Sequence, residues 1–242
     1  MIDIWTMSSS FQTSRPSPPW PPRVQVAGVS SLEEALFCGR VGVRALGFTL
    51  ELPSGVHDGL TTERACSIID RLPQDIMPVL ITYLDSSVEA ARLVKLLQVP
   101  AIQFHGAISD DQARSFRISC PSVRTIGRIT VSGPEALEEI SRFERPLWDA
   151  VILDSLDPGS GAVGATGLAH DWSLSARIVR RSLVPIILAG GLTAENVAEA
   201  IAVVRPHGVD AHTGCENLDG SRNFGKIRAF AEAALKAFDL PG

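Results

Sequence analysis

Apolar and polar positions follow two different patterns along the chain from Val24 onward. Short apolar runs are typical of buried strands, and the stretches between them repeat their apolar positions every three to four residues, as amphipathic helices do. The apolar runs predict eight strands, at Val24–Val26, Ala45–Thr49, Pro78–Tyr83, Ala101–Phe104, Arg124–Gly127, Ala150–Leu153, Pro185–Leu188 and Gly208–Ala211. The amphipathic stretches predict eight helices, near Leu32–Arg40, Thr62–Leu72, Val88–Leu97, Asp110–Ser119, Pro134–Phe143, Ser173–Arg181, Ala194–Val204 and Gly225–Phe238.

Regular alternation of strand and helix favours a closed parallel barrel. The alternative is a doubly wound open sheet, which usually has fewer strands and a glycine-rich loop after the first one. Here the glycine turns follow the last strands. We therefore predict an α/β fold, a single-domain (β/α)8 TIM barrel over residues 23–242.

Residues 1–22 have a different composition from the rest of the chain. They contain Ser8–Ser10 and the proline-rich run Pro16–Pro22, which favour extended geometry over helix or sheet. We predict a disordered or loosely packed Pro-rich N-terminal arm, with Trp5 and Trp20 as its contacts to the barrel. A Pro-rich ligand for a partner domain is the alternative.

Several predicted helices begin with a residue that can cap them. Ser31 followed by Glu34 fits a capping box, and Ser87 and Ser109 are candidate N-caps. Thr193 can cap the helix that follows the glycine turn.

Composition and charge exclude several function classes. Of the 242 residues, 45% are hydrophobic and 20% are charged, as in an ordinary globular protein, and the net charge of −5 does not favour nucleic acid or an anionic membrane. The four cysteines form no CxxC pair. With no apolar run of about 20 residues and no secretory signal, we expect a cytoplasmic protein with reduced thiols.

A glycine turn near the end of the chain predicts a phosphate site. Gly190 and Gly191 stand between a buried strand and a helix start, where backbone N–H groups and the helix dipole favour an oxyanion. A second candidate follows the last strand, at Thr213 and Gly214.

In a parallel barrel, the reacting groups lie where the strands end. The residues at these positions are Ala27, Glu51, Tyr83, Asp85, His105, Arg128, Asp154, Gly190 and His212. Asp154 closes an otherwise apolar strand, where it is a candidate for catalysis or for capping the next loop. Asp210 is a candidate for binding substrate or for orienting loop amides, and His105 is a candidate base or sugar-hydroxyl contact with a structural role as the favoured alternative.

Three kinds of cofactor chemistry find no support in the pattern. The histidines stand on separate strands without metal-ligand spacing, so we predict no metal site. Lys95, Lys226 and Lys236 fall in helical stretches, whereas a Schiff-base aldolase needs a strand-end lysine. No dinucleotide fingerprint follows a strand. We predict no cofactor.

The chain resembles the phosphoribosylanthranilate isomerase family of tryptophan biosynthesis over nearly all of Val24 to Phe238. The motifs that carry the resemblance are Ala45–Phe48, Ile102–Gly106, Ile152–Ser155, Gly164–Gly167, Asp171-Trp172, Leu188–Leu192, Glu195–Val197, Gly208–Asp210 with Gly214 and Glu216, and Lys226–Phe230. This resemblance implies an Amadori rearrangement, in which a general acid protonates the ring oxygen of an aminoaldose phosphate and a general base removes the C2 proton. It implies Asp154 as the acid.

The chain departs from the family where proton abstraction and aromatic recognition are expected. The family's base is a Cys at the end of the first strand, and Ala27 stands there. The family's carboxylate-binding Arg is replaced by His57, and its strand-8 serines by His212 and Thr213. His212 is therefore a candidate for a relocated base, with phosphate contact as an equal alternative; His105 is a further candidate.

Three functions remain open from the sequence. The first is a phosphoribosylanthranilate isomerase-like enzyme of weak or altered activity, the second a diverged phosphosugar enzyme, and the third a non-catalytic phosphosugar-binding barrel. In each, the partner is a small phosphosugar, and the protein is a monomer or a homodimer. The predicted residues are Asp154 and His212 for catalysis; Gln103, His105, Arg128 and Asp210 for substrate binding; and Gly164, Gly190, Gly191, Thr213 and Gly214 for phosphate binding.

Overall fold

A computed structural model describes residues 20–51, 60–143, 146–155 and 171–240. Within these residues eight parallel strands form one closed barrel, in which each strand pairs with the next and β8 pairs with β1. The strands are β1 (Val24–Val26), β2 (Ala45–Leu50), β3 (Met77–Thr82), β4 (Ala101–Phe104), β5 (Arg124–Thr130), β6 (Ala150–Asp154), β7 (Ile186–Leu188) and β8 (Gly208–Ala211). The predicted (β/α)8 barrel is confirmed.

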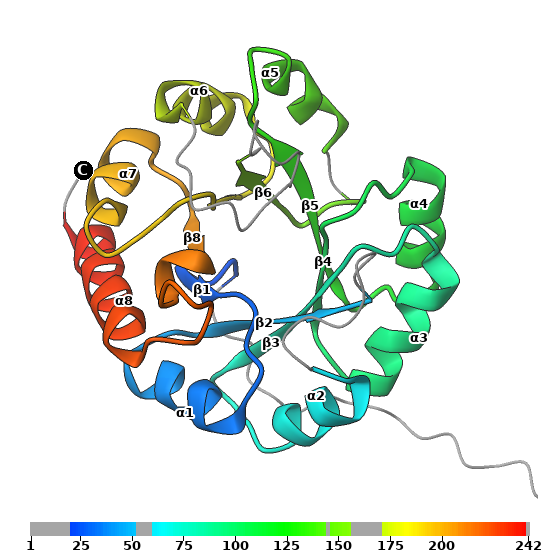
Figure 1. Ribbon diagram of the computed structural model, residues 1–242. Helices are drawn as coiled ribbons and strands as arrows, with labels where there is room; N and C mark the ends of the chain where they lie inside the picture. The colour runs from blue at the N-terminus through cyan, green and yellow to red at the C-terminus, as the bar shows by residue number, and fades with distance from the viewer. Residues whose placement is uncertain (1–19, 52–59, 144–145, 156–170, 241–242) are drawn as a thin grey trace, which may run out of the picture.

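The helices form a ring around the strands (Figure 1). They are α1 (Leu32–Arg40), α2 (Thr62–Ile69), α3 (Ser87–Leu97), α4 (Asp110–Ser119), α5 (Ala136–Glu139), α6 (Trp172–Arg181), α7 (Val197–Val204) and α8 (Phe224–Asp239). Two short 3-10 helices are η1 (Ile140–Arg142), which continues α5, and η2 (Thr213–Cys215), which follows β8.

Two of the predicted helix caps are wrong. The cap of α3 is Ser86, whose hydroxyl accepts from the Glu89 N–H, so Ser87 is the first helical residue. Helix α7 begins only after Asn196, because Thr193 opens a turn first: its N–H donates to the Asn196 side chain at 2.8 Å. The predicted cap at Ser109 is confirmed.

Side-chain size divides the core into two layers. Inside the barrel lies a cluster of mostly small or medium residues, comprising Ala45, Met77, Val79, Ala101, Ile126, Ala150, Ile152, Ile187 and Ala189. The fully buried phenylalanines, Phe48, Phe104, Phe116 and Phe230, belong to the larger cluster between strands and helices. An eight-stranded barrel is just wide enough to be filled by its own side chains, so small and medium residues fit inside it and the large aromatic rings pack outside, against the helices.

Trp20 lies at the end of the barrel where the strands begin. Its indole N–H donates to the Asp149 carbonyl at 3.2 Å, the Arg124 guanidinium stands over its ring at 5.6 Å, and it packs against the interior cluster. The predicted contact of Trp20 with the barrel is confirmed, whereas Trp5 lies outside the described residues.

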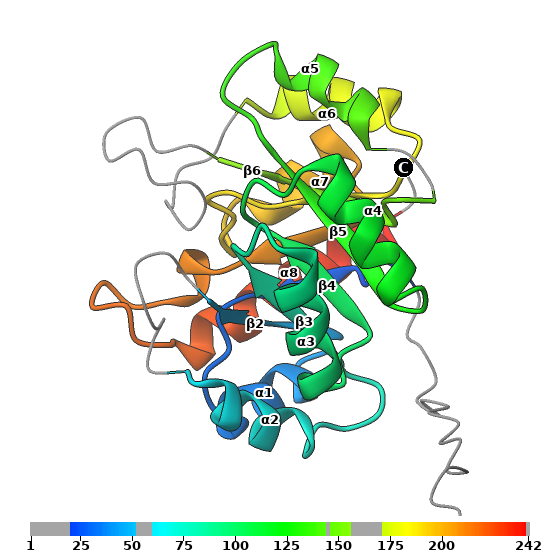
Figure 2. The same ribbon diagram turned by 90° about the vertical axis from the view of Figure 1, so that its right-hand side faces the viewer.

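The opposite end of the barrel, where the strands end, carries the candidate site. Figure 2 shows the end of β6 and the segment between β8 and α8 on the same side of the molecule. Among the described residues, no helix is long and apolar enough to cross a membrane.

Candidate active site

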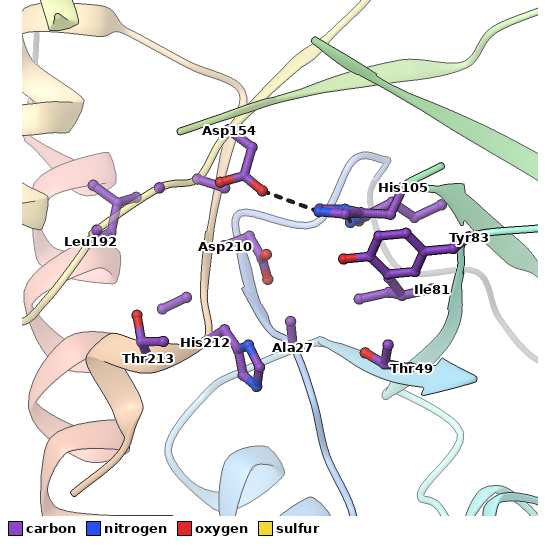
Figure 3. Close-up of a pocket in the computed structure, with 15 residues that line it drawn as sticks. Ala27, Thr49, Ile81, Tyr83, His105, Asp154, Leu192, Asp210, His212 and Thr213 are labelled. Atoms are coloured by element: carbon purple, nitrogen blue, oxygen red, sulfur yellow. Dashed lines mark hydrogen bonds and ion pairs between the residues drawn. The ribbon is translucent and has the colours of Figure 1, made fainter. Parts of the chain in front are cut away.

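A pocket opens at the carboxyl ends of the strands and brings together most of the predicted site residues (Figure 3). It is lined by Ala27, Thr49, Ile81, Tyr83, Gln103, His105, Asp154, Ala189, Gly190, Gly191, Leu192, Asp210, Ala211, His212 and Thr213. Glu51 and Asp85, two other strand-end residues, are exposed and do not line it. Gly164 lies outside the described residues.

Asp154 ends β6 with both carboxylate oxygens engaged. Oδ1 accepts the Ser155 backbone N–H at 2.8 Å, and Oδ2 lies 3.3 Å from Nε2 of His105. The side chain is buried, with 4% of the residue exposed. These contacts hold the carboxyl group in one orientation at the pocket wall, as a proton-transfer group requires.

A chain of buried amides continues from His105 across the barrel. The Gln103 side-chain amide is 3.3 Å from Nδ1 of His105, and its carbonyl oxygen accepts from the Gln25 amide at 3.1 Å. Because Gln103 donates to Nδ1, the imidazole hydrogen lies on Nε2 and points to Asp154. His105 thus orients the carboxylate, in keeping with its expected structural role.

Asp210, on β8, stands at the other end of this chain beside Gln25. Residue exposure is 7%, and Oδ1 has no hydrogen-bond partner within the part of the chain that the structure describes. Burial and the nearby Asp154 charge raise the pKa of Asp210 to about 7, and the Gln25 hydrogen bond and Arg222 only partly oppose this. The pocket therefore holds two carboxyl groups in different electrostatic environments.

His212 lies at the edge of the pocket, beside the end of β1. Its Nε2 is 3.2 Å from the Glu216 carboxylate, and a Cβ added at Gly28 would overlap the ring. Ala27, the preceding residue, donates its N–H to the Ala211 carbonyl at 3.0 Å. The imidazole thus stands beside the end of β1.

Arg222 connects His212 with the end of β1, a contact that sequence patterns did not reveal. Its guanidinium lies 3.0 Å from the Glu34 carboxylate and 3.6 Å from that of Glu216, and it donates to the carbonyls of His212 and Ala27. The Arg222 side chain is 11% exposed and that of Glu34 is 2% exposed. The only sequence signal was Glu34, assigned to a capping box with Ser31. Ser31 does cap α1 by accepting the Glu34 N–H, whereas the Glu34 carboxylate accepts the Ser30 N–H and faces Arg222.

The side of the pocket that the sequence predicts to bind phosphate contains two places where backbone segments approach closely. Gly190 and Gly191 both have positive φ, +83° and +64°, which glycine adopts without strain. A Cβ at Gly214 would overlap the Leu192 carbonyl oxygen. Next to the pocket lies a hollow lined by Gly191, Thr193, Ala194, Glu195, Thr213, Gly214, Asn223, Gly225, Lys226 and Ala229.

Arg128 comes near the site without lining the pocket. Its guanidinium donates to the Thr130 hydroxyl at 2.8 Å, and Nε is buried without a hydrogen-bond partner among the described residues. Burial lowers the pKa of Arg128, and the charges of Asp154 and Tyr83 oppose this. Arg128, on β5, is therefore near enough to the Asp154 carboxylate to interact with its charge.

Among the described residues, no group of three His, Cys, Asp or Glu side chains is placed to hold a metal ion. The four cysteines are free. Burial raises the pKa of Cys215 to about 12, so the thiol nearest the site is protonated at neutral pH.

The model of the N-(5'-phosphoribosyl)anthranilate (PRA) isomerase family matches residues 67–233. The chain belongs to this family. Isomerase 2 of Methanosarcina mazei is 38% identical over 216 residues, covering 89% of this chain and 95% of the relative. This membership makes the chain an isomerase-family enzyme and confirms the resemblance found in the sequence.

Solved structures of the family share the fold. The phosphoribosylanthranilate isomerase of Thermotoga maritima has a TM-score of 0.76 and 28% identity, covering 89% of this chain and 99% of its own. A family structure in complex with reduced 1-(o-carboxyphenylamino)-1-deoxyribulose 5-phosphate has a TM-score of 0.75 and 26% identity, with 89% and 99% covered.

Proposed function

We propose that this phosphoribosylanthranilate isomerase-family chain catalyses the aldose-to-ketose (Amadori) isomerisation of a phosphorylated aminosugar, with Asp154 as general acid. The observation that carries the proposal is the position of Asp154. It is buried, held by Ser155 and His105, and lies in the same pocket as the Gly190-Gly191 turn. An acid on one wall and a phosphate cradle on another are what ring opening of an anchored sugar phosphate needs.

The remaining predicted residues surround this sugar. Gln103, His105, Arg128 and Asp210 are proposed to face the sugar and its substituent, and Gly164, Gly190, Gly191, Thr213 and Gly214 to bind the phosphate. His212 and Thr213, adjacent in the sequence, both line the pocket. The alternative role of His212 as the relocated base is compared with that of Asp210 below.

The experiment is the decay of phosphoribosylanthranilate fluorescence, measured with the purified protein and with Asp154→Asn. We expect turnover in the parent and a loss of about 10²–10⁴-fold in kcat in the variant, the range for removing a general acid. Binding of the reduced product analogue should persist in both, because the phosphate side is unchanged. Unchanged turnover in Asp154→Asn would overturn the role of Asp154.

A parent protein that binds the analogue but shows no turnover would support a non-catalytic phosphosugar-binding barrel instead. The observation that favours this second function is Ala27, whose methyl group cannot accept a proton at the end of β1.

A further inference from the structure

Asp210 and Ala27 line the same pocket, on the neighbouring strands β8 and β1. Strands β8 and β1 are paired with Asp210 opposite Gln25, two residues before Ala27. Figure 3 shows the Asp210 carboxylate between the Asp154 carboxylate and the Ala27 methyl group. A sugar that contacts Asp154 and covers Ala27 therefore lies against Asp210.

The hydrogen bonds of the two carboxylates make them chemically different. Asp154 accepts from Ser155 and faces His105, so both of its oxygens are engaged. Asp210 keeps Oδ1 without a hydrogen-bond partner among the described residues, although the residue is only 7% exposed. A buried, unpaired acceptor is costly unless a ligand satisfies it, so the oxygen is available for a proton from the substrate.

We propose that Asp210 is the general base of this isomerase and takes the C2 proton in place of the thiol absent at Ala27. This inference rests on the proposed function. It assigns to Asp210 a catalytic role that neither the substrate-binding prediction nor the family resemblance contains.

The two carboxyl groups balance the reaction with one proton between them. Asp154 protonates the ring oxygen; the C1–O bond breaks and the nitrogen lone pair forms the C1=N iminium. Asp210 takes the C2 proton; the C2–H electron pair becomes the C1=C2 bond, and the C1=N pair returns to nitrogen. Asp210 then protonates C1 as the C2 hydroxyl gives its proton to Asp154, which forms the ketone and restores both groups.

The surroundings of Asp210 suit this role. It is faced by Asp154 from β6, Gln25 from β1, Cys215 from η2 and Arg222 from the segment before α8. Burial and Asp154 raise its pKa to about 7, where a carboxylate is a stronger base yet still ionises at neutral pH.

The test measures kcat and KM with phosphoribosylanthranilate for the parent and for Asp210→Asn. We expect kcat to fall about 10²–10⁴-fold with KM little changed. The double variant Asp210→Asn, Ala27→Cys should have a kcat at least tenfold higher than Asp210→Asn alone, because a thiol then stands where the family carries its base. A residue that only binds substrate would not be rescued in this way. Asp239→Asn, an exposed Asp-to-Asn exchange, is the matched control with unchanged kcat.

The outcomes separate this inference from the proposed function. Binding of the reduced product analogue by Asp210→Asn, at parental affinity, verifies that the variant is folded. Asp210 as base would be overturned by any one of three results: Asp210→Asn retaining kcat within tenfold, a lack of rescue by Ala27→Cys, or a larger kcat loss in His212→Gln than in Asp210→Asn. In each case the parent still turns over. A parent without turnover would instead refute the proposed function, and the role of Asp210 with it.

Discussion

Replacing Arg222 by methionine should cost more stability than any exchange of an exposed arginine in this protein. The Arg222 guanidinium faces the carboxylates of Glu34 and Glu216 and donates to two backbone carbonyls. Methionine keeps a long apolar side chain but removes the cation that faces Glu34, whose side chain is 2% exposed. Removing one partner of a buried ion pair typically costs about 3–5 kcal/mol.

This loss is large relative to the total stability of about 5–15 kcal/mol that is typical of folded proteins. For a chain of this size, 1 kcal/mol lowers Tm by roughly 2–4 °C, so Arg222→Met should lower it by about 6–20 °C. Adding Glu34→Gln removes the remaining buried charge and should recover part of this loss. The end of β1 should also loosen, because the Ala27 carbonyl loses its donor.

The assay is urea denaturation followed by fluorescence and circular dichroism, with the free energy of unfolding extrapolated to water. The control is Arg181→Met. Arg181 pairs with Glu138 at 3.1 Å, but the two side chains are 53% and 79% exposed, so we expect at most about 1 kcal/mol. Equal losses in Arg222→Met and Arg181→Met would refute the conclusion that burial makes the Arg222 contacts strong.

Two further predictions concern stability. Burial raises the pKa of Asp149, but hydrogen bonds from Arg117, the Thr125 N–H and Arg124 outweigh it and lower the pKa. A lowered pKa stabilises the fold above the unfolded pKa of about 3.9, so the cost of Asp149→Asn should be full at pH 7 and should shrink as the pH falls below about 4. At pH 7, losing hydrogen bonds to this charged group should cost about 1.5–3 kcal/mol. A pH-independent cost would contradict this. Gly190→Ala should destabilise by about 1–3 kcal/mol and reduce turnover, because φ is +83° and a Cβ would overlap the Ser155 hydroxyl. The control is Gly220→Ala, because Gly220 also has a positive φ of +81° but an added Cβ there would meet no atom within 4 Å. If both variants lost the same stability, backbone strain alone would explain the loss and the overlap with Ser155 would not contribute.

Local patterns were sufficient for the strands and for most of the pocket wall. Residues at the ends of predicted strands, such as Tyr83, His105 and Asp154, line the pocket because parallel strands all end on one side of the barrel. The ends of the elements were predicted less accurately. The predicted fifth strand ended at Gly127, whereas β5 continues to Thr130. A Cβ at Gly127 would overlap the Phe143 ring, so this glycine makes room for packing and does not end the strand.

The sequence by itself determined the barrel and the family, because eight apolar runs and the strand-end motifs are properties of short segments. It also places Ala27, which cannot accept a proton, at the end of the first strand. Only the tertiary structure decided that Arg222 reaches Glu34, far away in the chain. It also decided that both oxygens of Asp154 have a neighbour, Ser155 or His105, while Asp210 Oδ1 has no hydrogen-bond partner among the described residues. The physical reason is that burial and charge act through space: the proton affinity of Asp210 depends on every group that the closed barrel brings around it.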